Sequence, residues 1–73
     1  MKNIDDEIYN LANMLKKRRN QLHLTQEKLA DIADFDRTYI SLLERGKRNP
    51  SYLNLLKLCQ ALELKITFLG EEK

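Results

Sequence analysis

The 73-residue sequence has few of the residues that carry most enzymatic and metal chemistry. It contains one cysteine, one histidine and no tryptophan. A single cysteine cannot form an intrachain disulfide or a thiolate cluster, so we expect a reducing environment. No glycine-rich phosphate loop, carboxylate pair or metal-ligand spacing occurs, and a chain this short leaves little room for a pocket. The sequence therefore predicts a protein that is not an enzyme and that uses no cofactor and no metal.

Long hydrophobic segments are absent too. No run of apolar residues exceeds two, whereas a membrane-spanning helix needs about 20 predominantly apolar residues. The first ten residues, MKNIDDEIYN, have neither the basic leader nor the apolar region of a signal peptide. We therefore expect a cytoplasmic protein with no membrane partner. The length indicates one domain over residues 1–73, and a core this small favours a dimer.

Apolar residues recur at intervals of three and four in four successive segments, which is the period of an amphipathic helix. The predicted helices cover residues 5–22, 26–34, 37–45 and 52–62. Thr25, Asp36 and Ser51 stand before the last three helices as N-caps, and Gly46 can adopt the left-handed conformation that ends the third. The predicted fold class is all-α, with a core between about residues 11 and 62.

After residue 62 the pattern changes from helical to alternating, which is typical of a strand. Because the chain has no second strand, a strand over residues 63–69 would pair with the same segment of a second copy. A short fifth helix is the alternative. The fourth predicted helix is also unusually apolar. The predicted dimer or partner surface consists of Leu53, Leu58, Leu64, Ile66, Phe68 and Leu69.

Positive charge is concentrated in the middle of the chain, although the net charge is only +2. Between Lys16 and Arg48 there are nine Lys and Arg residues against five Asp and Glu residues. This distribution predicts that the middle of the chain faces phosphate groups. A solvated surface of mixed charge is the alternative.

A short helix, a tight turn and a second helix with a polar outer face form an arrangement that places the second helix in the DNA major groove. Arg37 suits a bidentate contact to guanine, Thr38 offers a hydroxyl or a methyl group, and Leu42 can contact thymine methyl groups. Tyr39 flanks this face, where base contact and packing against the preceding helix are both open. Ser41 also faces outward.

One segment, LTQEKLADIADFDRTYISLLERGKRNPSYLNLLKLCQAL, resembles the Cro/phage-repressor-type (XRE-like) helix-turn-helix family. The resemblance implies a lambda-repressor-like domain of four or five helices. It also implies a homodimer that binds double-stranded DNA carrying an inverted-repeat operator. The diagnostic elements occur in order: Thr25-Gln26 before Leu29-Ala30, then Tyr39-Ile40-Ser41, then Glu44-Arg45-Gly46 followed by Arg48-Asn49-Pro50.

The same resemblance implies roles for individual residues. Gln26 matches a position that binds a phosphate and braces the recognition helix, and Arg19 matches one that pairs with Glu44. His23 and Glu63 stand where the family commonly has glycine after a helix. With the outward residues of the third helix and the basic loop after it, the predicted contacts to the DNA backbone are Gln26, Ser41, Arg45, Lys47, Arg48 and Asn49.

Two narrower resemblances point to different regulators. The end segments LANMLKKRRNQ and QALELKITFLGEE resemble antitoxins of Hip-type kinase toxin-antitoxin modules, whereas residues 36–41 resemble restriction-modification controller proteins. Our main hypothesis from the sequence is an autorepressing antitoxin with a possible toxin kinase partner. A restriction-modification controller or a phage-type repressor is the alternative. A protein-interaction module that neutralises a toxin, with DNA binding secondary, is an alternative of another class.

Overall fold

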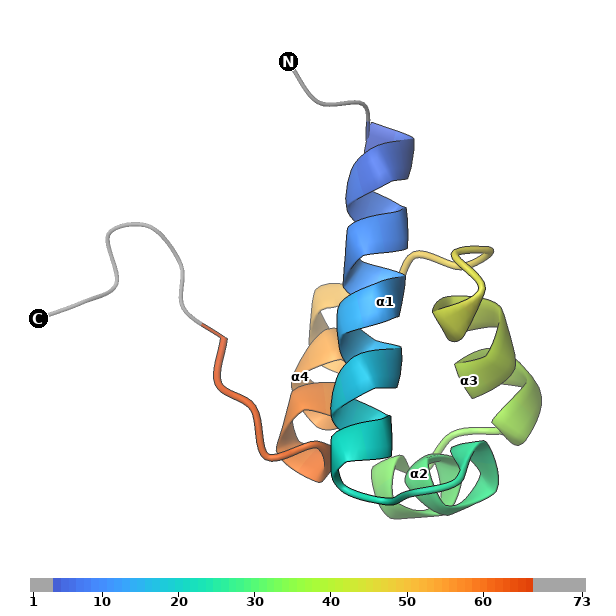
Figure 1. Ribbon diagram of the computed structural model, residues 1–73, viewed down its shortest axis with the longest axis vertical. Helices are drawn as coiled ribbons and strands as arrows, with labels where there is room; N and C mark the ends of the chain where they lie inside the picture. Colours follow the sequence, from blue (N-terminus) through green and yellow to red (C-terminus); the bar gives the residue numbers. More distant parts are fainter. Residues whose placement is uncertain (1–3, 67–73) are drawn as a thin grey trace, which may run out of the picture.

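The computed structural model describes residues 4–66 and places four helices in them. These helices are α1 (Ile4–Gln21), α2 (Gln26–Ala33), α3 (Arg37–Glu44) and α4 (Tyr52–Ala61) (Figure 1). The described part of the chain contains no strand. The predicted all-α fold class is confirmed. Five of the eight helix ends differ from the predicted ones by one residue, and the other three coincide with them.

The predicted N-cap residues stand directly before three of these helices. The Thr25 hydroxyl accepts a hydrogen bond from the backbone N–H of Lys28 at 3.0 Å, and the Ser51 hydroxyl accepts one from Asn54 at 3.1 Å. Each bond satisfies a backbone donor that the helix itself leaves unpaired. Asp36 occupies the N-cap position of α3 with an extended backbone, but its side chain makes no capping hydrogen bond.

The core brings together side chains from all four helices. Leu15 of α1 is 2% exposed, and the largest fully buried side chains are Leu29, Ile40, Leu58 and Leu62. Burying a side chain of this size stabilises the fold by about 1.5–3 kcal/mol. The packing of α2 and α3 into this core fixes the position of α3 relative to the rest of the domain.

The prediction that Leu58 belongs to a partner surface is wrong. Its side chain is 1% exposed and packs in the core with Leu29 and Leu62. Leucines lie on several sides of α4, so the sequence period does not identify the side that faces the core. Leu53, predicted for the same surface, is 69% exposed.

The strand expected over residues 63–69 is not formed in the part of it that the structure describes. Residues 64–66 have neither strand nor helix, because a strand needs a partner for its backbone groups and a single chain offers none. Phe68 and Leu69 lie outside the described residues. Leu64 and Ile66 instead line an apolar groove of about 280 Å³ together with Leu11, Met14, Leu15, Leu55, Cys59 and Lys65.

Within residues 4–66, four residues have a positive φ, and two of them are the expected His23 and Glu63. The φ angles are 59° at His23 and Glu63, 64° at Asp34 and 71° at Gly46. At Gly46 there is no space for a side chain either, since a Cβ atom would lie 2.9 Å from the ring of Tyr9. A residue other than glycine in this conformation costs about 1–2 kcal/mol.

Replacing His23 with glycine is expected to stabilise the domain. The strain relieved exceeds the extra backbone entropy of glycine in the unfolded chain, which is about 0.5–1 kcal/mol, so His23→Gly should raise the free energy of unfolding by about 0.5–1 kcal/mol. Urea unfolding followed by circular dichroism measures it. As a control, Lys17→Gly, one turn before the end of α1, should lower the free energy of unfolding by about 0.7 kcal/mol. A loss of stability in His23→Gly would contradict the prediction.

Candidate nucleic-acid interface

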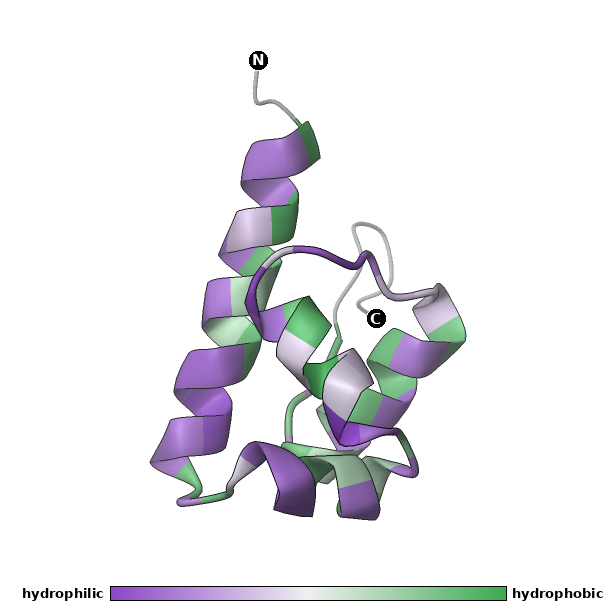
Figure 2. Cartoon of the chain, turned by 90° about the vertical axis from the view of Figure 1, so that its right-hand side faces the viewer, coloured by the Kyte–Doolittle hydropathy of each residue, from purple (hydrophilic) through white to green (hydrophobic). Residues whose placement is uncertain are grey.

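The turn between α2 and α3 is tight and held by backbone hydrogen bonds. Asp34 ends α2 in the left-handed conformation, and the N–H of Phe35 donates to the carbonyl oxygen of Ala30 at 2.8 Å. α3 begins two residues later, at Arg37. Figure 2 shows the molecule from the right-hand side of Figure 1, and α3 lies in the foreground of this view. The turn therefore presents α3 at a fixed angle to α2, as a recognition helix requires.

The outer face of α3 carries the side chains predicted to contact bases. Ile40 and Leu43 are buried on the inner face, at 1% and 2% exposure. Arg37 and Thr38, in the first turn, are exposed, whereas Leu42 is half-buried. The structure therefore brings Arg37 and Thr38 to one open end of the helix and leaves Leu42 at the edge of this face.

Tyr39 connects α3, the loop after it and α4. Its ring centroid lies 4.8 Å from that of Phe35, and the guanidinium carbon of Arg48 lies 5.3 Å from the Tyr39 ring centroid. Its hydroxyl accepts a hydrogen bond from Nδ2 of Asn54 at 3.0 Å. The side chain is thus packed and positions Arg48. No pattern in the sequence indicates this role of Asn54, because Tyr39 and Asn54 lie in different helices.

A buried ion pair joins α1 to the end of α3. Nε and Nη2 of Arg19 donate to the two carboxylate oxygens of Glu44 at 2.6 Å and 3.0 Å, and Nη1 donates to the carbonyl oxygen of Leu24 at 2.7 Å. The side chains of Arg19 and Glu44 are 10% and 3% exposed. Nε2 of Gln26 also donates to Glu44, at 3.1 Å. These bonds fix α1, the start of α2 and the end of α3 relative to one another.

The loop after α3 presents the predicted backbone contacts. Lys47, Arg48 and Asn49 are exposed, as is Arg45, while Ser41 on α3 is half-buried. The N–H of Lys47 donates to the carbonyl oxygen of Leu42 at 2.9 Å, which ties the loop to α3. The loop is strongly hydrophilic and lies beside α3 (Figure 2). The candidate base contacts Arg37 and Thr38 therefore lie in the first turn of α3, and the basic loop lies at the other end of this helix.

Within residues 4–66, no three His, Cys, Asp or Glu side chains come close enough together to hold a metal ion. Burial raises the pKa of the Cys59 thiol, which disfavours the reactive thiolate. No helix in this part of the chain is both long enough and apolar enough to cross a membrane.

Comparisons with known proteins agree with this geometry. A helix-turn-helix family model matches residues 15–69. Control protein C.MunI from a Mycoplasma species is 44% identical over 57 residues, which are 77% of this chain and 77% of that protein.

Two solved structures of controller proteins are similar in fold and in sequence. The restriction-modification controller protein C.AhdI from Aeromonas hydrophila has a TM-score of 0.80 and 37% identity, covering 82% of this chain and 91% of that one. The controller protein C.Esp1396I, solved as a tetramer with its natural 35-base-pair operator, has a TM-score of 0.76 and 36% identity, covering 80% of this chain and 76% of that one.

Proposed function

Because the chain belongs to the helix-turn-helix family of Cro and phage repressors and is a sequence-specific DNA-binding regulator of that type, we propose that it is the controller protein of a restriction-modification system. Its target is an operator upstream of its own gene. The observation that carries the proposal is the exposed first turn of α3, which presents Arg37 and Thr38, together with the exposed basic loop that follows the same helix. The relatives above support the controller interpretation over the antitoxin hypothesis, and they do not support a toxin kinase partner.

In this proposal α3 enters the major groove by its first turn. Arg37 donates two hydrogen bonds to guanine O6 and N7, and Thr38 contacts the neighbouring base. Lys47, Arg48 and Asn49 contact the sugar-phosphate backbone, which sets the position of α3 without reading sequence. Tyr39 supports this arrangement, because its ring packs against the guanidinium of Arg48.

We further propose that the protein binds as a homodimer. A dimer places two recognition helices in successive major grooves about 34 Å apart, so the operator is an inverted repeat. Two features of α4 favour a second copy: Leu53 is 69% exposed, and an apolar groove lies between α1, α4 and residues 64–66. The tetramer of C.Esp1396I on its operator supports assembly on DNA.

Substituting Arg37 and Arg48 separates base reading from phosphate binding. Arg37→Ala should cost about 1–3 kcal/mol on the upstream operator and relax the preference at one base-pair position, because a bidentate contact to guanine is lost. Arg48→Ala should weaken binding to operator and scrambled duplexes by the same factor. Fluorescence anisotropy with labelled duplexes measures both affinities.

Circular dichroism melting of each variant shows whether the domain is still folded. Equal losses on both duplexes for Arg37→Ala would contradict its assignment as a base reader. If the wild-type protein binds no fragment from the region upstream of its gene, the controller proposal itself is contradicted.

A further inference from the structure

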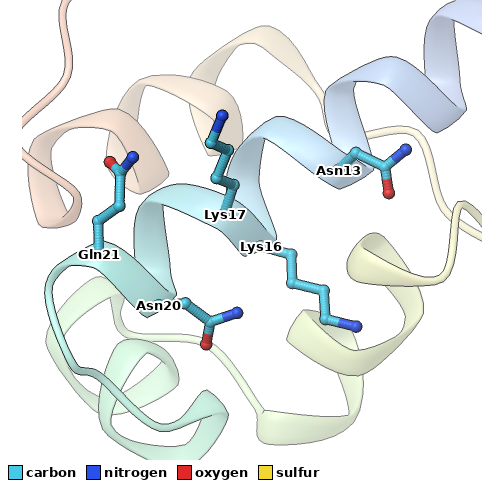
Figure 3. Close-up of a pocket in the computed structure, with 5 residues that line it drawn as sticks. All are labelled: Asn13, Lys16, Lys17, Asn20 and Gln21. Carbon is cyan, nitrogen blue, oxygen red and sulfur yellow. The ribbon is translucent and has the colours of Figure 1, made fainter.

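A polar face of α1 lies beside the proposed interface and has no role in it so far. Five residues of this face line a shallow depression of about 490 Å³: Asn13, Lys16, Lys17, Asn20 and Gln21 (Figure 3). No acidic residue lines it, and two of the five are cationic. A surface of this composition favours an anionic partner.

Two contacts show which side of α1 faces the end of α3. Near the start of α1, the Tyr9 ring lies under Gly46, and near its end Arg19 binds Glu44. At about 100° per residue, Lys16 falls between Tyr9 and Arg19 around the helix, about 60° from Arg19. Lys16 therefore lies on the edge of α1 that borders the loop at 46–49.

The side chains on this edge extend in different directions. Lys16 and Asn20 extend toward α3, whereas Lys17 extends away from it (Figure 3). Lys16 is exposed, and within residues 4–66 it makes no hydrogen bond or ion pair. Its ammonium group thus keeps three donors available for an acceptor outside the chain.

The neighbouring donors are already in use. Arg19 is 8% exposed, and each of its three guanidinium nitrogens donates to Glu44 or to the carbonyl oxygen of Leu24. Gln26 gives one of its amide hydrogens to Glu44. A phosphate at this edge would therefore find its free cation at Lys16 and not at Arg19.

We propose that Lys16, supported by the amide of Asn20 one turn later, contacts a DNA phosphate and extends the backbone-binding surface from the basic loop onto α1. This inference rests on the proposed DNA-binding function. It adds one cationic contact per protomer, on the side of α3 away from α4. A phosphate contact carries no sequence information, so it contributes to affinity and salt dependence alone.

The two adjacent lysines provide a matched test. Lys16→Gln and Lys17→Gln remove the same charge from neighbouring exposed positions, and circular dichroism melting should show that both variants fold as the wild type does. The affinity for the upstream duplex and for a scrambled duplex is measured by anisotropy across a series of salt concentrations. In a dimer, Lys16→Gln should make the negative slope of log K against log salt shallower by about 2. It should also reduce the affinity for both duplexes by about tenfold. Lys17→Gln should change the slope by less than half as much.

Each alternative result has a distinct meaning. Equal changes of the slope in the two variants would overturn the inference. The effect would then come from the overall positive charge of the protein and not from a contact made by Lys16. A wild-type slope in Lys16→Gln would overturn it as well, while leaving the proposed function intact. If the wild-type protein itself binds neither duplex, both the inference and the proposed function fail.

Discussion

Replacing Arg19 with methionine is expected to lower the free energy of unfolding by about 3–5 kcal/mol. The substitution leaves the Glu44 carboxylate, 3% exposed, without its bidentate partner and with only the amide of Gln26. An uncompensated buried charge is strongly destabilising, whereas a domain of this size has only about 4–11 kcal/mol in total. Urea unfolding of the variant should therefore show a much lower midpoint, with part of the protein unfolded in buffer.

A double variant tests whether the stranded charge is the cause. In Arg19→Met with Glu44→Leu, both charges are replaced by apolar side chains, and such replacements are often neutral or stabilising. The double variant should recover at least about 2 kcal/mol relative to Arg19→Met alone. Lys17→Met, at an exposed position of the same helix, should stay within about 0.5 kcal/mol of the wild type. If the double variant is less stable than the single one, the packing role of Arg19 dominates and the explanation fails.

Affinity for the operator is expected to fall at least about a thousandfold between about 50 mM and about 200 mM salt. Arg45, Lys47 and Arg48 are exposed and give three cations per protomer, and therefore six in a dimer. At a slope of about −0.9 per phosphate contact, the six contacts of these residues give a slope of log K against log salt of about −5, and the proposed Lys16 contact on each protomer would make it about −7. The slope arises from counterions that the bound cations release from the DNA.

An anisotropy titration of the upstream duplex at several salt concentrations measures this slope. Arg48→Ala, which removes one cation per protomer, should make this negative slope shallower by about 2 in a dimer. A slope of log K against log salt of about −1 would show that few of these side chains reach phosphates. The loop would then not be the element that binds the DNA backbone.

Local rules were enough to predict the helices. Thr25 and Ser51 cap helices because their hydroxyls satisfy backbone donors within three residues. Gly46 ends α3 through its positive φ of 71°, as a glycine just after a helix commonly does. Each of these signals depends only on residues a few positions away in the chain, so it can be recognised from the sequence alone. The outward positions of Arg37 and Thr38 follow from the same helical period.

Features that depend on distant residues were not predictable in this way. Leu58 is in the core because α2 packs against that side of α4, and the sequence of α4 offers apolar residues on several sides. The bond between Asn54 and Tyr39 joins two helices, and no spacing rule signals it. The strand expected after residue 62 depends on a second chain, which a periodic pattern cannot supply.

Whether α3 reads a specific DNA sequence is measured by a competition experiment. The purified protein is bound to a labelled duplex from the region upstream of its gene, and unlabelled upstream or scrambled duplex is added at a fixed salt concentration. The scrambled duplex should compete at least about a thousandfold more weakly than the upstream duplex, which is the lower end of the range for specific DNA-binding proteins. Equal competition by the two duplexes would show that the protein binds phosphates alone and that α3 reads no specific sequence.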